Sequence, residues 1–169
     1  MIQRAQWVIP LFLIGLVLLF LTVNVFARLP ASNYINAMAS GQYKRAAEHL
    51  NKDVSKGDPQ AQNALANLYY LGLGQTSNYR RAAELYHAAA QQGYGPAQLN
   101  LGHLYKQGLG VIENAERALG WYVQASMAGS PLAEKYQSQL FAEHTLTPNH
   151  MSAVKEKWLI LDLLAAEPL

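Results

Sequence analysis

The sequence matches itself when it is shifted by 36 residues. The identical positions are Gly57, Gly93 and Gly129; Ala61, Ala97 and Ala133; Leu65 and Leu101; Leu68 and Leu104; Tyr69 and Tyr105; Ala82 and Ala118; Tyr86 and Tyr122; and Ala89 and Ala125. So many identities at one offset do not arise by chance. A fixed period of this length is typical of proteins built from stacked helical repeats.

Each unit has the residue pattern of two helices. The apolar spacing predicts a first helix over residues 59–71 and a second over about 78–92. Gly72 and Gly74 lie between them and permit a turn with positive φ. Small alanines let helices approach closely, and tyrosines fill the space between successive pairs. We therefore predict an all-α fold, a helix-turn-helix solenoid of about three repeats.

The repeat pattern continues more weakly on both sides of these two units, over residues 31–143. An earlier unit has only a short first helix, near residues 33–39. A later unit starts after Gly129, but Gln137 stands where the pattern calls for a core leucine. We expect this third unit to be decayed, and we assign the repeat region to residues 28–147.

Residues 93–129 carry a motif of a known family: Ala97-Gln98, Leu101-Gly102-His103-Leu104-Tyr105, Gly108-Leu109-Gly110-Val111, Ala118, Trp121-Tyr122, Ala125 and Gly129. This motif resembles the Sel-one-like repeat (SLR), a branch of the tetratricopeptide superfamily. The preceding unit departs from it at Ala66, in place of Gly, and at Leu85, in place of Trp. The resemblance implies an adaptor or assembly role, as in many bacterial envelope proteins that build or regulate membrane machines.

An uncharged apolar run of 20 residues extends from Trp7 to Phe26. A helix of that length spans about 30 Å, the thickness of the hydrocarbon layer of a bilayer. We predict a transmembrane anchor within residues 1–27. The alternative is a cleaved signal peptide with Val25-Phe26-Ala27 at the cleavage site. We expect a single-pass protein of the bacterial inner membrane with its repeat region in the periplasm.

The C-terminal segment, residues 148–169, reads as one more helix. Thr147-Pro148 is a typical helix start, and one apolar stripe follows it. A solenoid needs a cap on its last repeat, so this helix is predicted to cap the third unit. The alternative is a docking helix, which would bind a partner through the surplus apolar residues Leu159, Ile160 and Leu163.

Composition and motifs argue against most kinds of chemistry. The chain has no cysteine, which excludes disulfides and thiolate nucleophiles, and its net charge of +2 gives no general attraction to nucleic acid. No two histidines have the i, i+4 spacing of a helical metal site, and His144 and His150 only flank one loop. We expect no catalytic site, no metal, no cofactor, no nucleic-acid partner and no small-molecule substrate.

The candidate binding surface follows from the resemblance, because proteins with such repeats generally bind through the first helix of each unit. Amides, a ring and a cation on that face suit the backbone of an extended peptide. Once the core positions are removed, the predicted concave face holds Asn63, Asn67, Tyr70, His103, Lys106 and Gln107.

These features together predict a membrane-anchored scaffold or adaptor that binds a membrane-associated protein and assists a cell-envelope machine. One alternative is a single-helix accessory subunit of a larger membrane complex. A second alternative is a cell-wall-binding protein or a hydrolase. The relatives described as hydrolases are cysteine-rich, whereas this chain has no cysteine.

Overall fold

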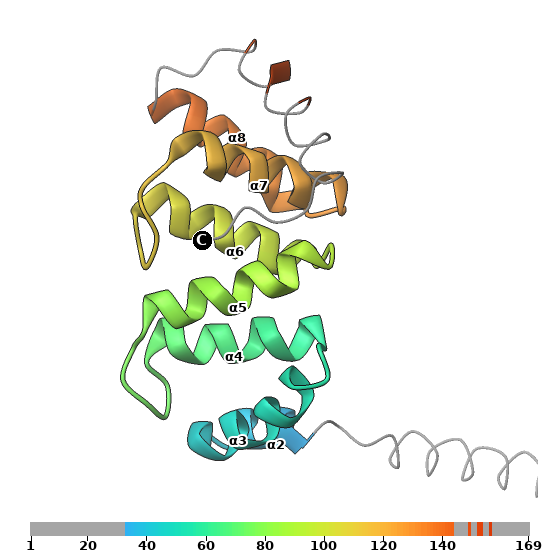
Figure 1. Cartoon of the computed structure of the whole chain (residues 1–169), viewed down its shortest axis with the longest axis vertical. Helices are drawn as coiled ribbons and strands as arrows, with labels where there is room; N and C mark the ends of the chain where they lie inside the picture. The colour runs from blue at the N-terminus through green and yellow to red at the C-terminus, as the bar shows by residue number, and fades with distance from the viewer. Residues whose placement is uncertain (1–32, 144–148, 150–151, 154–155, 157–169) are drawn as a thin grey trace, which may run out of the picture.

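The computed structural model describes residues 33–143, 149, 152–153 and 156, and the described chain is helical with no strand. Figure 1 shows the helices stacked one on another, with α2 and α3 at one end and α8 at the other. The helices are α2 (Asn33–Ala39), α3 (Tyr43–Val54), α4 (Pro59–Leu71), α5 (Tyr79–Gln91), α6 (Gly95–Gln107), α7 (Ala115–Met127) and α8 (Pro131–Glu143). The predicted all-α solenoid is confirmed for this part of the chain.

Each helix packs mainly against its neighbours in sequence, from α2 on α3 through to α7 on α8. This arrangement is characteristic of a solenoid, in which stability comes from repeats and the interfaces between adjacent repeats. The first helices of the units are α2, α4, α6 and α8, and the second helices are α3, α5 and α7. Residues 59–71, predicted as a first helix, form α4 with those bounds.

The ends of the helices are set by residues that recur at the repeat period. Gly72 and Gly108 both have φ 66° and end α4 and α6 in the left-handed conformation. Asn78 and Asn114 are N-caps whose side-chain oxygens accept hydrogen bonds from the backbone N–H of the third helical residue, at 2.9 and 2.8 Å. The turn between first and second helices therefore has the same geometry in both units.

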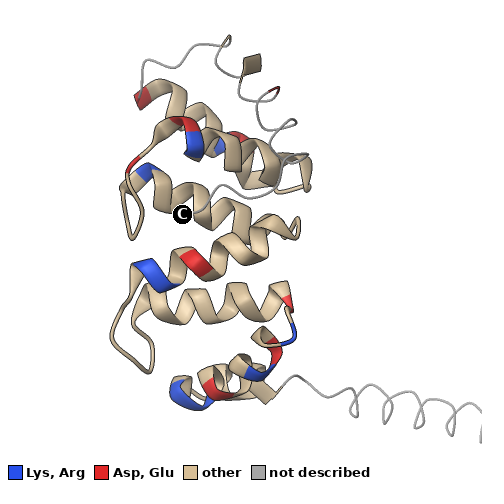
Figure 2. Cartoon of the chain, in the orientation of Figure 1, with Lys and Arg blue, Asp and Glu red and all other residues tan. Residues whose placement is uncertain are grey.

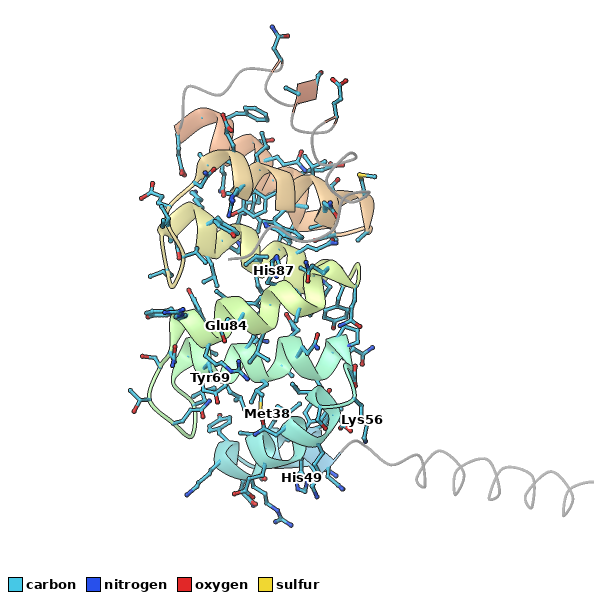
Figure 3. The ribbon with its side chains drawn as sticks, viewed as in Figure 1. Met38, His49, Lys56, Tyr69, Glu84 and His87 are labelled. Atoms are coloured by element: carbon cyan, nitrogen blue, oxygen red, sulfur yellow. The ribbon has the colours of Figure 1, made fainter. Side chains whose placement is uncertain are left out.

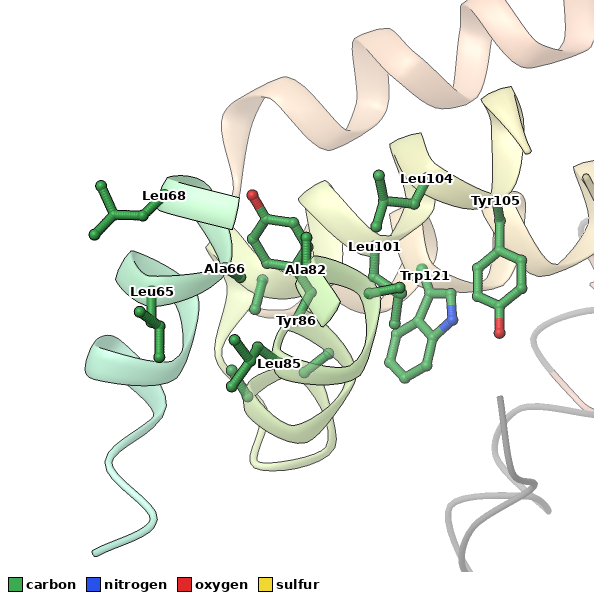
Figure 4. Packing of buried hydrophobic residues seen from close by; sticks show 14 of the residues in the cluster. Leu65, Ala66, Leu68, Ala82, Leu85, Tyr86, Leu101, Leu104, Tyr105 and Trp121 are labelled. Atoms are coloured by element: carbon green, nitrogen blue, oxygen red, sulfur yellow. The ribbon is translucent and has the colours of Figure 1, made fainter. Parts of the chain in front are cut away.

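The core is built from alanines and large side chains in alternation. Ala82 and Ala118 are fully buried, and Tyr86 and Tyr122 fill the space that these small residues leave. Figure 4 shows Tyr86 close to Ala66 and Ala82 in this core. At Gly102 an added Cβ would lie 2.6 Å from Cε1 of Tyr122, so the tyrosine ring rests directly on the backbone of α6.

The predicted core position of Tyr69 is only partly correct, because its ring is half-buried whereas that of Tyr105 is buried. The arginines of the two units are also placed differently. The guanidinium of Arg117 lies 5.5 Å from the centre of the Tyr105 ring. The equivalent residue in the preceding unit, Arg81, instead makes an ion pair with Glu84 at 2.8 Å. Figure 3 shows both Tyr69 and Glu84 in this part of the stack.

The third unit, whose repeat pattern is decayed in the sequence, still forms a regular first helix. Its first helix, α8, has 13 residues, the same length as α4 and α6. Gln137 is buried at the leucine position, and its Nε2 donates to the backbone carbonyl of Tyr122 at 3.0 Å. A polar side chain is tolerated there because its donor is satisfied. The departure from the repeat pattern at Gln137 therefore leaves the helix itself intact.

The predicted anchor (residues 7–26) and the predicted C-terminal helix with Leu159, Ile160 and Leu163 lie outside the described residues, apart from the isolated positions 149, 152–153 and 156. Among the residues that are described, no helix has the length and apolar character needed to cross a bilayer.

Successive repeats touch through their backbones at one glycine per turn. Gly110 has φ 73°, and a Cβ added to it would lie 2.3 Å from the carbonyl carbon of Tyr79 at the start of α5. Gly74, 36 residues earlier, meets the backbone of Tyr43 and Lys44 in the same way. No side chain fits at these contacts, so they hold the long turns against the preceding second helices.

We therefore expect Gly110→Ala to destabilise the protein strongly. Gly93→Ala is the matched control, because Gly93 has φ 78° and nothing within 4 Å of an added Cβ. Left-handed strain alone should cost about 1–2 kcal/mol in Gly93→Ala. The added backbone collision should raise the cost of Gly110→Ala to about 3 kcal/mol or more. Urea unfolding followed by circular dichroism gives both free energies, and equal losses would contradict the close contact.

Candidate functional site

The predicted concave face is called the first-helix face below; its residues are Asn63, Asn67, Tyr70, His103, Lys106 and Gln107. Buried tyrosines of the second helices make contacts with residues of this face. The hydroxyl of Tyr86 in α5 donates to Oδ1 of Asn67 in α4. The hydroxyl of Tyr122 in α7 lies 2.9 Å from Nδ1 of His103 in α6. Asn67 and His103 are 36 residues apart, and so are the two tyrosines. The same contact therefore recurs in both units, with a different partner for the tyrosine hydroxyl in each.

Neighbouring first helices are also joined by side chains on this face. Nδ2 of Asn100 donates to Oδ1 of Asn63 at 3.1 Å, which links α6 to α4. Lys106 forms an ion pair with Glu143 at 2.6 Å, which links α6 to α8. Asn63 is buried, so its predicted exposure is wrong. Lys106 is not the free cation that the sequence suggested, since its side chain is only 21% exposed and is paired.

The other predicted residues of this face are placed less tightly. Tyr70 is half-buried, and its ring meets the ring of Tyr79 edge-on, with centroids 5.5 Å apart. Gln107 is exposed at the end of α6. The structure thus brings Asn67, Tyr70, His103 and Lys106 onto the first helices as expected, but most of them already have partners.

Tyr136 is a member of the face that the sequence reasoning missed. Its ring stands edge-on to His103, with centroids 4.2 Å apart, and it stacks against Tyr122 at 5.7 Å. The repeat period contained the signal, because Tyr136 lies 36 residues after Asn100 and so belongs to the same helical face. The assumption that the third unit was decayed hid it.

His103 is held in its neutral form. Burial lowers the pKa of its imidazole, and the nearby ammonium of Lys106 lowers it further. Burial also raises the pKa of the Tyr122 hydroxyl, with Tyr136 and Glu143 adding to the effect, so that hydroxyl stays protonated. In the tautomer that accepts this hydroxyl at Nδ1, the neutral imidazole carries its proton on Nε2 and presents an N–H donor there.

His87, in the second helix α5, is a related case away from the first-helix face. Its ring meets Trp121 edge-on at 5.8 Å, and burial together with Arg117 lowers its pKa. Figure 3 labels it in the middle of the stack. In the described part of the chain, no three His, Asp or Glu side chains come together as a possible metal site.

The repeats can now be compared with known proteins. The Sel1 repeat family model matches residues 59–94 and 95–130. These segments contain α4 with α5 and α6 with α7. Residues 59–130 are therefore similar to two successive Sel1 repeats. This finding and the similar solved structures support the predicted resemblance to the Sel1-like repeat family.

Two solved structures are similar to this chain. A Sel1 repeat protein from Oxalobacter formigenes has a TM-score of 0.61 and 34% identity, over 65% of this chain and 45% of its own. A protective antigen of uropathogenic Escherichia coli strains with an SLR fold has a TM-score of 0.62 and 25% identity, over 86% of this chain and 32% of its own. The chain thus spans less than half the length of either protein. No curated protein matches it.

The neutral state of His103 predicts a dependence of stability on pH. The folded-state pKa is lowered, so below about pH 6.5, the usual histidine value, the unfolded chain binds more protons than the folded chain. The contribution of His103 to the free energy of unfolding should be constant above about pH 7. It should fall as the pH drops from there towards the folded-state pKa. His87 should contribute in the same direction.

Two variants separate the titration of His103 from its hydrogen bond. His103→Asn places here the residue that accepts the equivalent tyrosine hydroxyl in the preceding unit, so it should keep the bond and reduce the pH dependence. His103→Leu removes the acceptor and should be less stable than His103→Asn by about 1 kcal/mol at pH 7.5. Urea titrations between pH 5 and 8 measure both effects. An unchanged pH slope in His103→Asn would show that His103 does not titrate on unfolding.

Proposed function

We propose that this protein is a membrane-anchored scaffold that binds an extended segment of another protein on its first-helix face. Proteins with Sel1 repeats are generally protein-interaction scaffolds, and their fold is typically non-catalytic. The membrane partner, the cell-envelope role and the periplasmic location of the repeats belong to this proposal. They rest on the apolar run Trp7–Phe26 and on the resemblance of the repeats.

The observation that carries the proposal is a pair of fixed donors one repeat apart. Asn67 uses Oδ1 to accept the Tyr86 hydroxyl, and its amide N–H group makes no hydrogen bond within the described chain. His103 likewise uses Nδ1 for Tyr122 and has no described partner at Nε2. Each donor is held in one orientation by a buried tyrosine. Such donors can bind the carbonyl oxygens of an extended peptide. The entropic cost of binding is lower because the side chains that carry them are already ordered before the peptide binds.

Asn67→Asp tests this directly. Aspartate keeps an oxygen for the Tyr86 hydroxyl but replaces the outward N–H donor with a second acceptor. Recovery of the bound protein from a mild-detergent extract should fall about tenfold, the effect of losing one such hydrogen bond at a site already ordered for it. Quantitative mass spectrometry of the captured material provides the measurement.

Asn51→Asp is the matched control, because it makes the same change at an exposed residue of α3. It should leave recovery unchanged. Circular dichroism should show that both variants remain folded. Equal recovery by both would remove the first-helix face as the binding surface.

The anchor has its own test. Alkaline carbonate should leave the full-length chain in the membrane pellet, because an apolar helix of about 30 Å stays in the bilayer when peripheral contacts are removed. N-terminal sequencing of the membrane-bound protein should find the original N-terminus. A mature chain starting at Arg28 would instead show that the apolar run is a cleaved signal peptide.

A further inference from the structure

Exposed apolar side chains lie on one edge of the first half of the solenoid. Leu71, the last residue of α4, is 60% exposed, and Tyr79, the first residue of α5, is 39% exposed. The turn between these two helices lies on the start of α3, because a Cβ added at Gly74 would lie 2.6 Å from the backbone nitrogen of Lys44. The end of α4 and the starts of α3 and α5 therefore form one continuous edge.

Basic side chains surround these apolar ones. Figure 2 shows Lys and Arg at the starts of α3 and α5, on the side of the stack where the long turns lie. We name this region the proximal edge and define it by its exposed residues Leu71, Tyr79, Lys44, Arg45, Arg80 and Arg81. Two acidic residues, Glu48 and Glu84, lie beside these four basic ones.

The acidic residues do not neutralise the proximal edge. The carboxylate of Glu84 is shared, because it lies 3.7 Å from Nε of Arg80 and 2.8 Å from Nη1 of Arg81. Within the described residues, Lys44 and Arg45 form no ion pair. The proximal edge therefore combines a positive excess with exposed apolar groups.

The same side of the stack has the opposite charge balance in its second half. The ends of α6 and α8, the turn after α6 and the start of α7 carry three acidic residues against two basic ones: Glu113, Glu116 and Glu143 against Lys106 and Arg117. Ile112 is 89% exposed in that turn, but it lies among these acidic residues. Positive charge and exposed apolar groups therefore occur together in the first half.

The length of the connecting chain keeps this half of the solenoid near the proposed membrane. Residues 27–32 join the apolar run, which ends at Phe26, to α2, which begins at Asn33. Six residues span at most about 20 Å. Helix α2 packs on α3, and α3 packs on α4, so the proximal edge belongs to the end of the stack that the proposed anchor tethers (Figure 1).

We propose that the proximal edge binds the surface of a membrane that contains anionic phospholipids. Its basic side chains contact lipid phosphate groups, and Leu71 and Tyr79 enter the interfacial layer, where aromatic rings of this kind are favoured. The inference rests on the proposed anchor, because tethering supplies the high local concentration that a small contact needs. The tether also favours a lipid surface over an acidic protein as the occupant.

This contact deepens the proposed function, because the proximal edge adjoins the first-helix face. The ring of Tyr79 packs edge-on against Tyr70 of that face, with centroids 5.5 Å apart. Asn67 lies one helical turn before Leu71 in α4. With the proximal edge on the bilayer, the first-helix face opens beside the membrane surface, where a segment of a membrane protein can reach it.

The test uses the full chain reconstituted in lipid vesicles. Because the chain has no cysteine, Leu71→Cys can be labelled at that position alone with the environment-sensitive fluorophore NBD. In vesicles of phosphatidylglycerol mixed with phosphatidylcholine, emission from the label should shift to the blue and strengthen. In vesicles of phosphatidylcholine alone, it should remain that of a label in water.

Met127→Cys is the matched control for the label. Met127 is 77% exposed at the end of α7, on the opposite side of the stack, where the shorter turns lie. Its label should remain in water in both kinds of vesicle. Equal burial of the two labels would mean that the solenoid has no preferred edge on the membrane, and it would refute the proposal.

Lys44→Gln, made in the chain labelled at position 71, tests the charges. The ratio of buried to solvated label should fall about fivefold, the effect of one basic residue near an anionic surface. Lys52→Gln removes the same charge from an exposed residue at the other end of α3, outside the proximal edge, and should change the ratio much less. Equal falls in the two variants would reduce the result to general charge attraction and refute the site.

The outcomes separate this inference from the proposed function. Release of the chain from the vesicles by alkaline carbonate would overturn the anchor and this inference together. A chain that stays in the vesicles while its label at position 71 remains in water would refute only the lipid contact. Equal burial of that label in both lipids would likewise refute the recognition of anionic lipid and leave the anchor and the first-helix face standing.

Discussion

The hydroxyl group of one buried tyrosine in each of the two central repeats connects the core of this protein to its first-helix face. Tyr86 and Tyr122 fill the space between alanines of the second helices and the backbone of the first helices, so their rings cannot move without opening the core. Their hydroxyl groups need acceptors because burial without one is costly. Asn67 and His103 are the hydrogen-bond partners of these hydroxyl groups and are thereby fixed in orientation.

This coupling explains how a small solenoid can hold a rigid polar surface. The side chains on the first-helix face are ordered by bonds to other helices, as in the contact of Asn63 with Asn100 and the ion pair of Lys106 with Glu143. The turn between α6 and α7 is ordered differently, through the backbone contact of Gly110 with Tyr79 and the placement of Arg117 over the Tyr105 ring. The two regions remain connected, because the ring of Tyr79 also packs edge-on against Tyr70 of the first-helix face.

Several details could have been taken further from the repeat alone. Tyr136 lies one period after Asn100, and its place on the first-helix face follows from that offset. The same offset connects Val154, Trp158 and Leu161 with Ala118, Tyr122 and Ala125, so the apolar stripe of the predicted C-terminal helix keeps the register of the second helices. The period is informative because every unit must bury the same face against its neighbours.

The sequence by itself determined the helical solenoid, the bounds of α4, the glycine turns and the alternation of alanine with tyrosine in the core. These features follow from local periodicity and from backbone conformations that only particular residues adopt. The tertiary structure decided which polar residues are free. Asn63 and Lys106 look exposed on a single helix, but their partners Asn100 and Glu143 lie 37 residues away in each case. Those contacts exist only once the helices have stacked, because hydrogen bonds and ion pairs depend on distances of about 3 Å that no helical pattern encodes.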